Sequence, residues 1–112
     1  TFVKDTCSAF LEIYKSDSFL GEVTNVGMNS EVSIEDLAKK IMDLLGIDLP
    51  FTSDQKRVRP EKSEVNRLVC SNEKLLKYSS WVPKYNLESG LLDTIQWFRE
   101  KGQLTKSKLY LV

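Results

Sequence analysis

The sequence of 112 residues contains no histidine and only two cysteines, Cys7 and Cys70. Without histidine the chain cannot form a Ser-His or Cys-His catalytic pair, and it lacks the usual imidazole general base. Two separated cysteines are too few for a disulfide scaffold or a zinc site, so we expect ordinary thiols at the core or its boundary and no metal site. Any catalysis within this chain would have to come from carboxylates, lysines or tyrosines.

The chain also lacks net charge, long apolar runs and glycine-rich phosphate loops. Sixteen basic and sixteen acidic residues cancel without clustering, which argues against nucleic acid or an anionic membrane as a partner. No apolar stretch approaches the ~20 residues that span a bilayer, and no signal-peptide pattern opens the chain. No G-x-G-x-x-G or Walker motif is present, so a dinucleotide is not expected to bind here. The composition predicts one ordinary globular domain, and we expect a cytoplasmic location.

Four helices are predicted from apolar spacing and capping residues. The clearest begins after Ser33, whose hydroxyl can accept a backbone N–H at the helix start, and ends at Gly46, which suits a left-handed C-terminal stop. The other three are expected to begin at caps formed by Asp5 or Thr6, by Ser71 or Asn72, and by Asn86. In the first helix, one apolar stripe is expected to contain Ala9, Phe10, Ile13 and Tyr14.

Short strands are predicted between these helices. Residues 1–3 read as the end of a strand, and residues 22–26, a β-branched run between two glycines, read as a buried strand. Residues 66–70 and part of 47–56 are further short strand candidates. The predicted fold class is therefore α/β in the mixed α+β sense, with short strands packed against about four helices in residues 1–102 and a tail over residues 103–112.

Concentrated binding chemistry occurs in only one stretch, the polar loop that contains Arg57, Arg59 and Glu64. An arginine offers a planar five-donor fork that binds phosphate, whereas an ionised carboxylate accepts both hydroxyls of a ribose. Arg59 and Glu64 could therefore hold the phosphate and ribose of a nucleotide. The alternative is a solvated loop in which the arginines, Arg67 included, pair with Glu61 and Glu64 for little energy.

Four aromatic residues invite a second binding hypothesis, a platform for a base or a sugar. They are Tyr85, Trp81, Trp97 and Phe98. The simpler interpretation is that Trp81 and Trp97 are core anchors that hold the last two helices together.

The polar loop and its surroundings resemble the extended short-chain dehydrogenases that act on nucleotide sugars. Residues 57–68, R-V-R-P-E-K-S-E-V-N-R-L, are similar to that family's R-P-x-E-V element, with a spacing two residues longer. Further similar runs follow in register: T-F-V-K-D at 1–5, G-E-V-T-N-V-G at 21–27, S-I-E-D-L at 33–37, N-E-K-L at 72–75, W-V-P-K at 81–84, L-E-S-G-L at 87–91 and T-I-Q-W-F at 94–98. The similarity thus covers residues 1 to about 101.

The resemblance implies a C-terminal substrate-binding lobe of an NAD-dependent nucleotide-sugar epimerase or 4,6-dehydratase. In that family a Rossmann half binds NAD(P) and carries the catalytic residues, so the partners expected here are that N-terminal half and a nucleoside-diphosphate sugar. Arg59 would bind the diphosphate, with Arg57 as a substitute, and Glu64 would bind the ribose hydroxyls. This chain alone would bind no cofactor and be inactive, and something is expected to precede Thr1.

Two alternatives stay open. The chain could be a non-catalytic binding or interaction module of the same fold, or the remnant of a larger protein. A lobe without its other half would expose apolar surface, so self-association into a homo-oligomer is also expected. The base, the sugar and the choice between epimerisation and dehydration do not follow from these residues.

Overall fold

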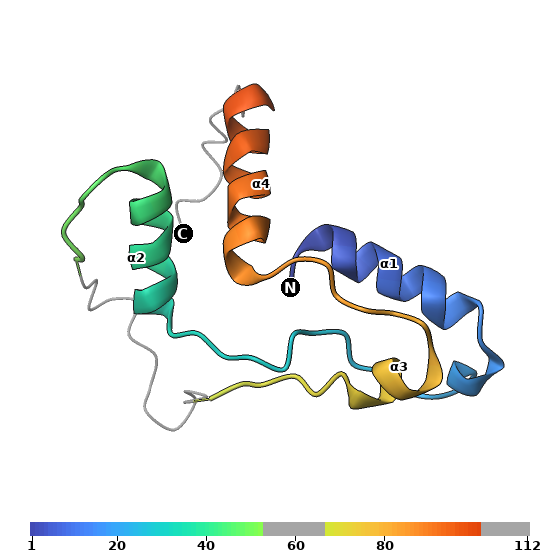
Figure 1. The fold of residues 1–112 in the computed structure, drawn as a ribbon. Helices are drawn as coiled ribbons and strands as arrows, with labels where there is room; N and C mark the ends of the chain where they lie inside the picture. Colours follow the sequence, from blue (N-terminus) through green and yellow to red (C-terminus); the bar gives the residue numbers. More distant parts are fainter. Residues whose placement is uncertain (53–66, 102–112) are drawn as a thin grey trace, which may run out of the picture.

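The structure, a computed structural model, describes residues 1–52 and 67–101. These ranges contain four α-helices and one short 3-10 helix and no β-strand (Figure 1): α1 (Val3–Tyr14), η1 (Asp17–Phe19), α2 (Ile34–Leu45), α3 (Glu73–Tyr78) and α4 (Leu87–Lys101). The predicted mixed α/β class with short strands is therefore wrong for the described part of the chain. The prediction of four helices is confirmed.

The described residues of the expected strands are irregular or helical, and residues 53–56 and 66 of two of these candidates lie outside the described residues. Val3 is the first residue of α1 rather than the end of a strand, and residues 22–26 are irregular. Gly27 lies directly against Cys70, since a Cβ on Gly27 would stand 2.5 Å from the Cys70 sulfur. No backbone hydrogen bond between residues 22–27 and 67–70 is found in the described ranges. A β-branched run becomes a strand only where a second strand pairs with it, and side-chain composition alone cannot supply that pairing.

Side-chain hydrogen bonds, rather than a β-ladder, join residues 27–29 to Asn72. The Asn29 amide donates to Asn72 Oδ1 at 2.6 Å, and the Asn72 backbone N–H donates back to Asn29 Oδ1 at 2.8 Å. The buried Asn72 side chain also donates to the Gly27 carbonyl at 2.7 Å. Asn72 stands at the N-cap position of α3 but makes no side-chain cap bond there, so its predicted capping role is replaced by this cross-link.

Helices α2 and α4 begin as predicted. Ser33 Oγ accepts from the Asp36 backbone N–H at 3.0 Å, and Gly46 ends α2 in the left-handed region at φ 68°. Asn86 Oδ1 accepts from the Ser89 N–H at 2.8 Å, while Ser89 Oγ accepts from the Asn86 N–H at 3.1 Å. This reciprocal pair satisfies two backbone donors at the start of α4.

The start of α1 differs from the prediction. Its N-cap residue is Phe2, which has no side chain to accept a hydrogen bond, and both predicted caps lie inside the helix. Asp5 is buried instead, because its carboxylate faces another part of the chain.

The core is small and lies between α1, η1, α3 and the segment that follows α3. Its buried apolar members are Ala9, Phe19, Leu75 and Trp81, with Ile13 and Val26 packed against them. The apolar stripe predicted for α1 is therefore wrong in part. Ala9 and Ile13 face this core, but Phe10 and Tyr14 are exposed on the other side of the helix.

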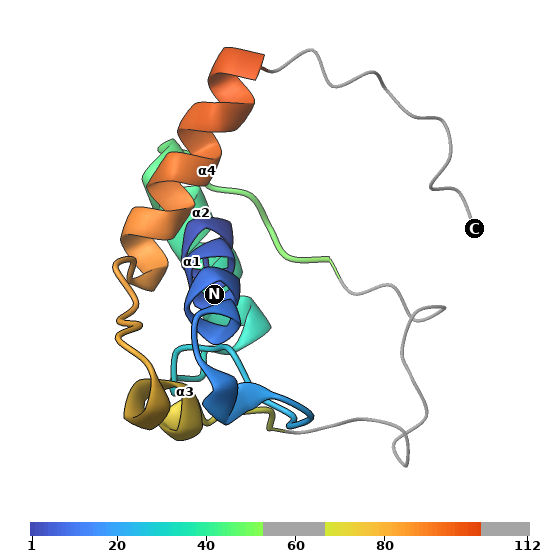
Figure 2. The same cartoon turned by 90° about the vertical axis from the view of Figure 1, so that its right-hand side faces the viewer.

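Helices α2 and α4 form a second packing unit, in which the two helices stand side by side and run in the same direction (Figures 1 and 2). Lys40 of α2 forms an ion pair with Glu88 of α4 at 2.9 Å. Every apolar residue of α2 is at least partly exposed. The small core and this open helix pair leave much apolar surface accessible.

Candidate functional site

The predicted substrate-binding residues Arg57, Arg59 and Glu64 all lie outside the described residues. The first described residue after them is Arg67, whose guanidinium binds Glu31 bidentately, at 3.1 Å from Nε and 2.6 Å from Nη2. Bidentate pairs of this kind add geometric specificity, although exposed pairs contribute little energy. Arg67, which follows the predicted binding loop, is thereby joined to Glu31.

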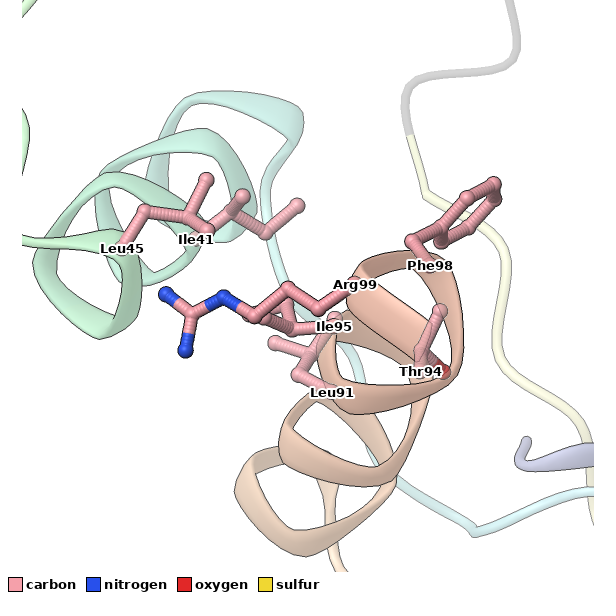
Figure 3. A pocket seen from close by; sticks show the side chains of 7 residues that line it. All are labelled: Ile41, Leu45, Leu91, Thr94, Ile95, Phe98 and Arg99. Carbon is pink, nitrogen blue, oxygen red and sulfur yellow. The ribbon is translucent and has the colours of Figure 1, made fainter. Parts of the chain in front are cut away.

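A pocket of about 420 Å³ lies between α2 and α4 (Figure 3). Its lining consists of Ile41, Leu45, Leu91, Thr94, Ile95, Phe98 and Arg99. The walls are apolar, and Figure 3 shows the Arg99 guanidinium extending from α4 toward α2. This size is within the range of small-molecule sites, but one cation and one hydroxyl supply few of the polar groups that a nucleotide sugar requires.

A second pocket, of about 330 Å³, lies where the start of α1 meets the middle of α4. It is lined by Phe2, Val3, Lys4, Asp93, Thr94 and Trp97. The Lys4 ammonium donates to Asp93 at 2.9 Å and to the Tyr85 hydroxyl at 3.2 Å. The Phe2 and Tyr85 rings pack together with centroids 4.4 Å apart. This pocket therefore has aromatic walls and a charged rim.

The ion pair at this rim shifts the titration of both partners. The hydrogen bond to Asp93, followed by that to Tyr85, raises the pKa of Lys4 above its usual value. The hydrogen bond from Lys4 lowers the pKa of Asp93. Both groups therefore stay charged across the neutral pH range, in a region that is open to solvent.

The two tryptophans behave differently. Trp81 is buried, and its indole N–H donates to the Asp5 carbonyl at 3.1 Å and to Ser8 Oγ at 3.0 Å, which confirms its predicted role as a core anchor. Trp97 is 51% exposed and packs edge-on against Phe98, so the same prediction is wrong for Trp97. Apolar spacing placed Trp97 on a helix correctly but could not tell which side of that helix is covered.

Asp5 is the residue that sequence patterns missed. Its side chain is 1% exposed, and its two oxygens accept the backbone N–H groups of Lys84 at 2.9 Å and Tyr85 at 3.0 Å. This carboxylate holds the chain between α3 and α4 against α1. The only signal in the sequence is an acidic residue within a helix turn, which local rules assign to capping.

Neither a cluster of metal ligands nor a membrane-spanning helix is found in the described ranges. No group of three or more potential metal ligands occurs in residues 1–52 and 67–101. Within the same ranges, no helix is both long and apolar enough to cross a membrane.

Comparison with known proteins gives significant matches along most of the chain. It is 30% identical over 102 residues to an Arabidopsis thaliana enzyme named as a trifunctional UDP-glucose 4,6-dehydratase, 3,5-epimerase and reductase, a match that covers 91% of this chain and 15% of that protein. It is 29% identical over 106 residues to human dTDP-D-glucose 4,6-dehydratase, covering 88% of this chain and 29% of that enzyme. A probable GDP-L-fucose synthase of Oryza sativa is 30% identical over 89 residues, covering 79% of this chain and 26% of the relative.

The chain is a relative of the nucleotide-sugar dehydratases and epimerases. The family resemblance inferred from the ordered motifs is thereby confirmed. The chain spans less than a third of the length of each of these relatives. No family model and no solved structure matches the chain significantly.

Proposed function

We propose that this chain is the nucleotide-sugar-binding lobe of an NAD-dependent nucleoside-diphosphate-sugar 4,6-dehydratase or epimerase. The observation that carries the proposal is the match of about nine-tenths of the chain to enzymes named as 4,6-dehydratases of UDP-glucose and dTDP-glucose. The lobe would comprise residues 1–102, with residues 103–112 as a tail. The NAD(P) cofactor and the catalytic groups would belong to a Rossmann half, so this chain alone would bind no cofactor and catalyse no turnover.

Within the lobe, the proposed substrate-binding residues are Arg59, Glu64 and Arg57. Arg59 or Arg57 would donate hydrogen bonds to the diphosphate, and Glu64 would accept from the ribose hydroxyls. What supports this assignment is the chemistry of the side chains, since a guanidinium suits a diphosphate and a carboxylate suits ribose hydroxyls, in a stretch that resembles the family's R-P-x-E-V element.

Nucleotide-sugar binding can be measured directly on the chain by ligand-observed NMR with UDP-glucose, dTDP-glucose and GDP-mannose. Loss of a hydrogen bond to a charged group costs about 1.5–3 kcal/mol, so Arg59→Ala and Glu64→Gln should each weaken binding about tenfold to a hundredfold. Arg99→Ala is a matched control, because Arg99 is an exposed arginine of α4 and belongs to a different pocket. Equal effects of Arg59→Ala and Arg99→Ala would contradict the proposed site.

A non-catalytic interaction module of the same fold is the second candidate, favoured by the apolar surface that the described residues leave open. Such a module predicts no saturable binding of any nucleotide sugar. A sugar-oxidation assay with NAD tests both candidates together. Turnover by this chain alone would contradict each of them.

A further inference from the structure

Residues 27–31 and 67–72 lie side by side and run in opposite directions (Figure 1). We call this pair of segments the junction. The contacts between them involve six residues: Gly27, Asn29, Glu31, Arg67, Cys70 and Asn72. Within the described residues no backbone hydrogen bond joins the two segments. These side-chain contacts therefore fix how the segments are aligned, a task that a β-ladder performs in a sheet.

Asn29 contributes to the junction through its backbone as well as its side chain. Among the described residues it is the only one other than glycine with a positive φ, of 51°. Asparagine tolerates this left-handed conformation better than most residues with a side chain. Its side chain exchanges two hydrogen bonds with Asn72, which is 3% exposed. A shift of one segment along the other would break both bonds at a buried amide, so the junction favours a single alignment.

The junction also sets where residues 32–66 begin and end relative to the core. Helix α2, the described helix in this stretch, has no buried residue, whereas the core lies among α1, η1, α3 and the segment after α3. Helix α2 packs against α4, and the ion pair between Lys40 and Glu88 joins these two helices. The alignment of the junction therefore determines much of the position of this stretch relative to α1 and α3.

The proposed substrate-binding residues all belong to the same stretch of the sequence. Glu64 stands three residues before Arg67, and Arg57 and Arg59 come before Glu64. Three residues span at most about 11 Å, so covalent geometry keeps Glu64 close to the junction. A shift of one residue in the alignment would move the adjoining backbone by about 3.3 Å. Hydrogen bonds to a ligand do not survive a displacement of that size.

We infer that Asn29 and Glu31 are positioning residues for the proposed nucleotide-sugar site, acting through their partners Asn72 and Arg67. This inference rests on the proposed function and adds to it two residues that lie outside the R-P-x-E-V element. The two residues hold one alignment of the chain, so their loss should weaken the binding of a nucleoside-diphosphate sugar by the folded protein.

Glu31→Gln gives a sharp test, because two effects on binding have opposite signs. Removal of a negative charge should by itself slightly tighten the binding of an anionic nucleotide. A positioning role predicts the reverse, a weakening of about twofold to fivefold, as expected for the loss of an exposed ion pair. Glu22→Gln is the matched control. It removes the same charge from an exposed ion pair with Lys74, which lies beyond the other end of the junction.

Asn29→Gly tests the hydrogen bonds of the junction. Glycine accepts a positive φ, so this variant removes the two bonds to Asn72 without adding backbone strain. The binding of UDP-glucose or dTDP-glucose, measured by ligand-observed NMR, should weaken about tenfold. Urea unfolding of the same variants establishes that each one is folded under the binding conditions. If Asn29→Gly does not fold, the comparison of Glu31→Gln with Glu22→Gln still decides the question.

An exchange of charges separates positioning from direct contact with the ligand. Glu31→Arg and Arg67→Glu should each weaken binding, and the double variant, which restores the ion pair, should recover most of it. A double variant that does not recover would assign Arg67 to the ligand itself and overturn the inference. Equal effects of Glu31→Gln and Glu22→Gln on a wild-type chain that binds would overturn the positioning role alone. If the wild-type chain binds no nucleotide sugar, the proposed function fails and this inference fails with it.

Discussion

The buried carboxylate of Asp5 should be the most sensitive polar position in this fold. Replacement by alanine leaves the part-buried backbone N–H groups of Lys84 and Tyr85 without their acceptor, the Asp5 side chain itself being buried. Each hydrogen bond to a charged group contributes about 1.5–3 kcal/mol, and a buried donor left unpaired costs about 1–3 kcal/mol. Because the two losses at each donor overlap, we expect Asp5→Ala to lower the free energy of unfolding by about 3–5 kcal/mol.

That loss is large for a domain of this size. The free energy of unfolding of native proteins is about 5–15 kcal/mol. The core of the described residues has only four buried apolar side chains. Asp5→Asn keeps one acceptor oxygen but turns its NH₂ group toward the other backbone donor, so it should lose about 2 kcal/mol or more. The order of stability should be wild type, then Asp5→Asn, then Asp5→Ala.

Urea unfolding followed by Trp81 fluorescence measures this order. The indole N–H binds the Asp5 backbone carbonyl rather than its side chain, so the reporter remains in place in both variants. Asp93→Asn removes a solvent-exposed carboxylate from α4 and should leave the unfolding free energy at neutral pH almost unchanged. If Asp5→Ala loses less than 1 kcal/mol, the role assigned to this carboxylate is wrong.

Three further predictions concern a cap, a close approach and an ion pair. Ser33→Ala removes the acceptor at the start of α2 and should cost about 1 kcal/mol in urea unfolding, whereas an unchanged midpoint would show that the cap is dispensable. Gly27→Ala places a methyl group against the Cys70 sulfur and should cost about 1–3 kcal/mol; adding Cys70→Ala should restore much of it, and failure to do so would locate the strain elsewhere. The pKa of Asp93 is lowered by Lys4, so the small stabilisation from this pair should be complete above about pH 4 and lost as the pH falls below that value. Asp93→Asn should remove that part of the acid dependence, and an unchanged pH profile would count against the pair.

The elements that the sequence predicts well are those decided within a few residues. Ser33 and Gly46 bracket α2 because a hydroxyl cap and a left-handed stop act on adjacent backbone groups. Asn86 likewise starts α4 through a bond to Ser89, three residues away. The prediction of strands was wrong for the opposite reason. Residues 22–26 could form a strand only with a distant partner, and no local pattern reveals such a partner.

The candidate sites divide in the same way. Ordered motifs led to the family and to Arg59 and Glu64, and comparison confirmed the family while these residues lie outside the described ranges. The pocket beside Trp97 could not be predicted, because it joins Phe2 to Trp97 across most of the chain. Spacing along a sequence locates residues on one helix face but does not bring two helices together.

The misassigned stripe of α1 shows why burial is the hardest property to predict here. Ala9 and Ile13 are neighbours of Phe10 and Tyr14 at helical spacing, so all four read as one apolar face. In the structure the first pair faces the core and the second pair faces outward. A helix that is apolar on two sides must bury both or carry an exposed surface, and its own chain covers only one side of α1. The exposed apolar residues of α1 are thus not explained by the core of the described residues.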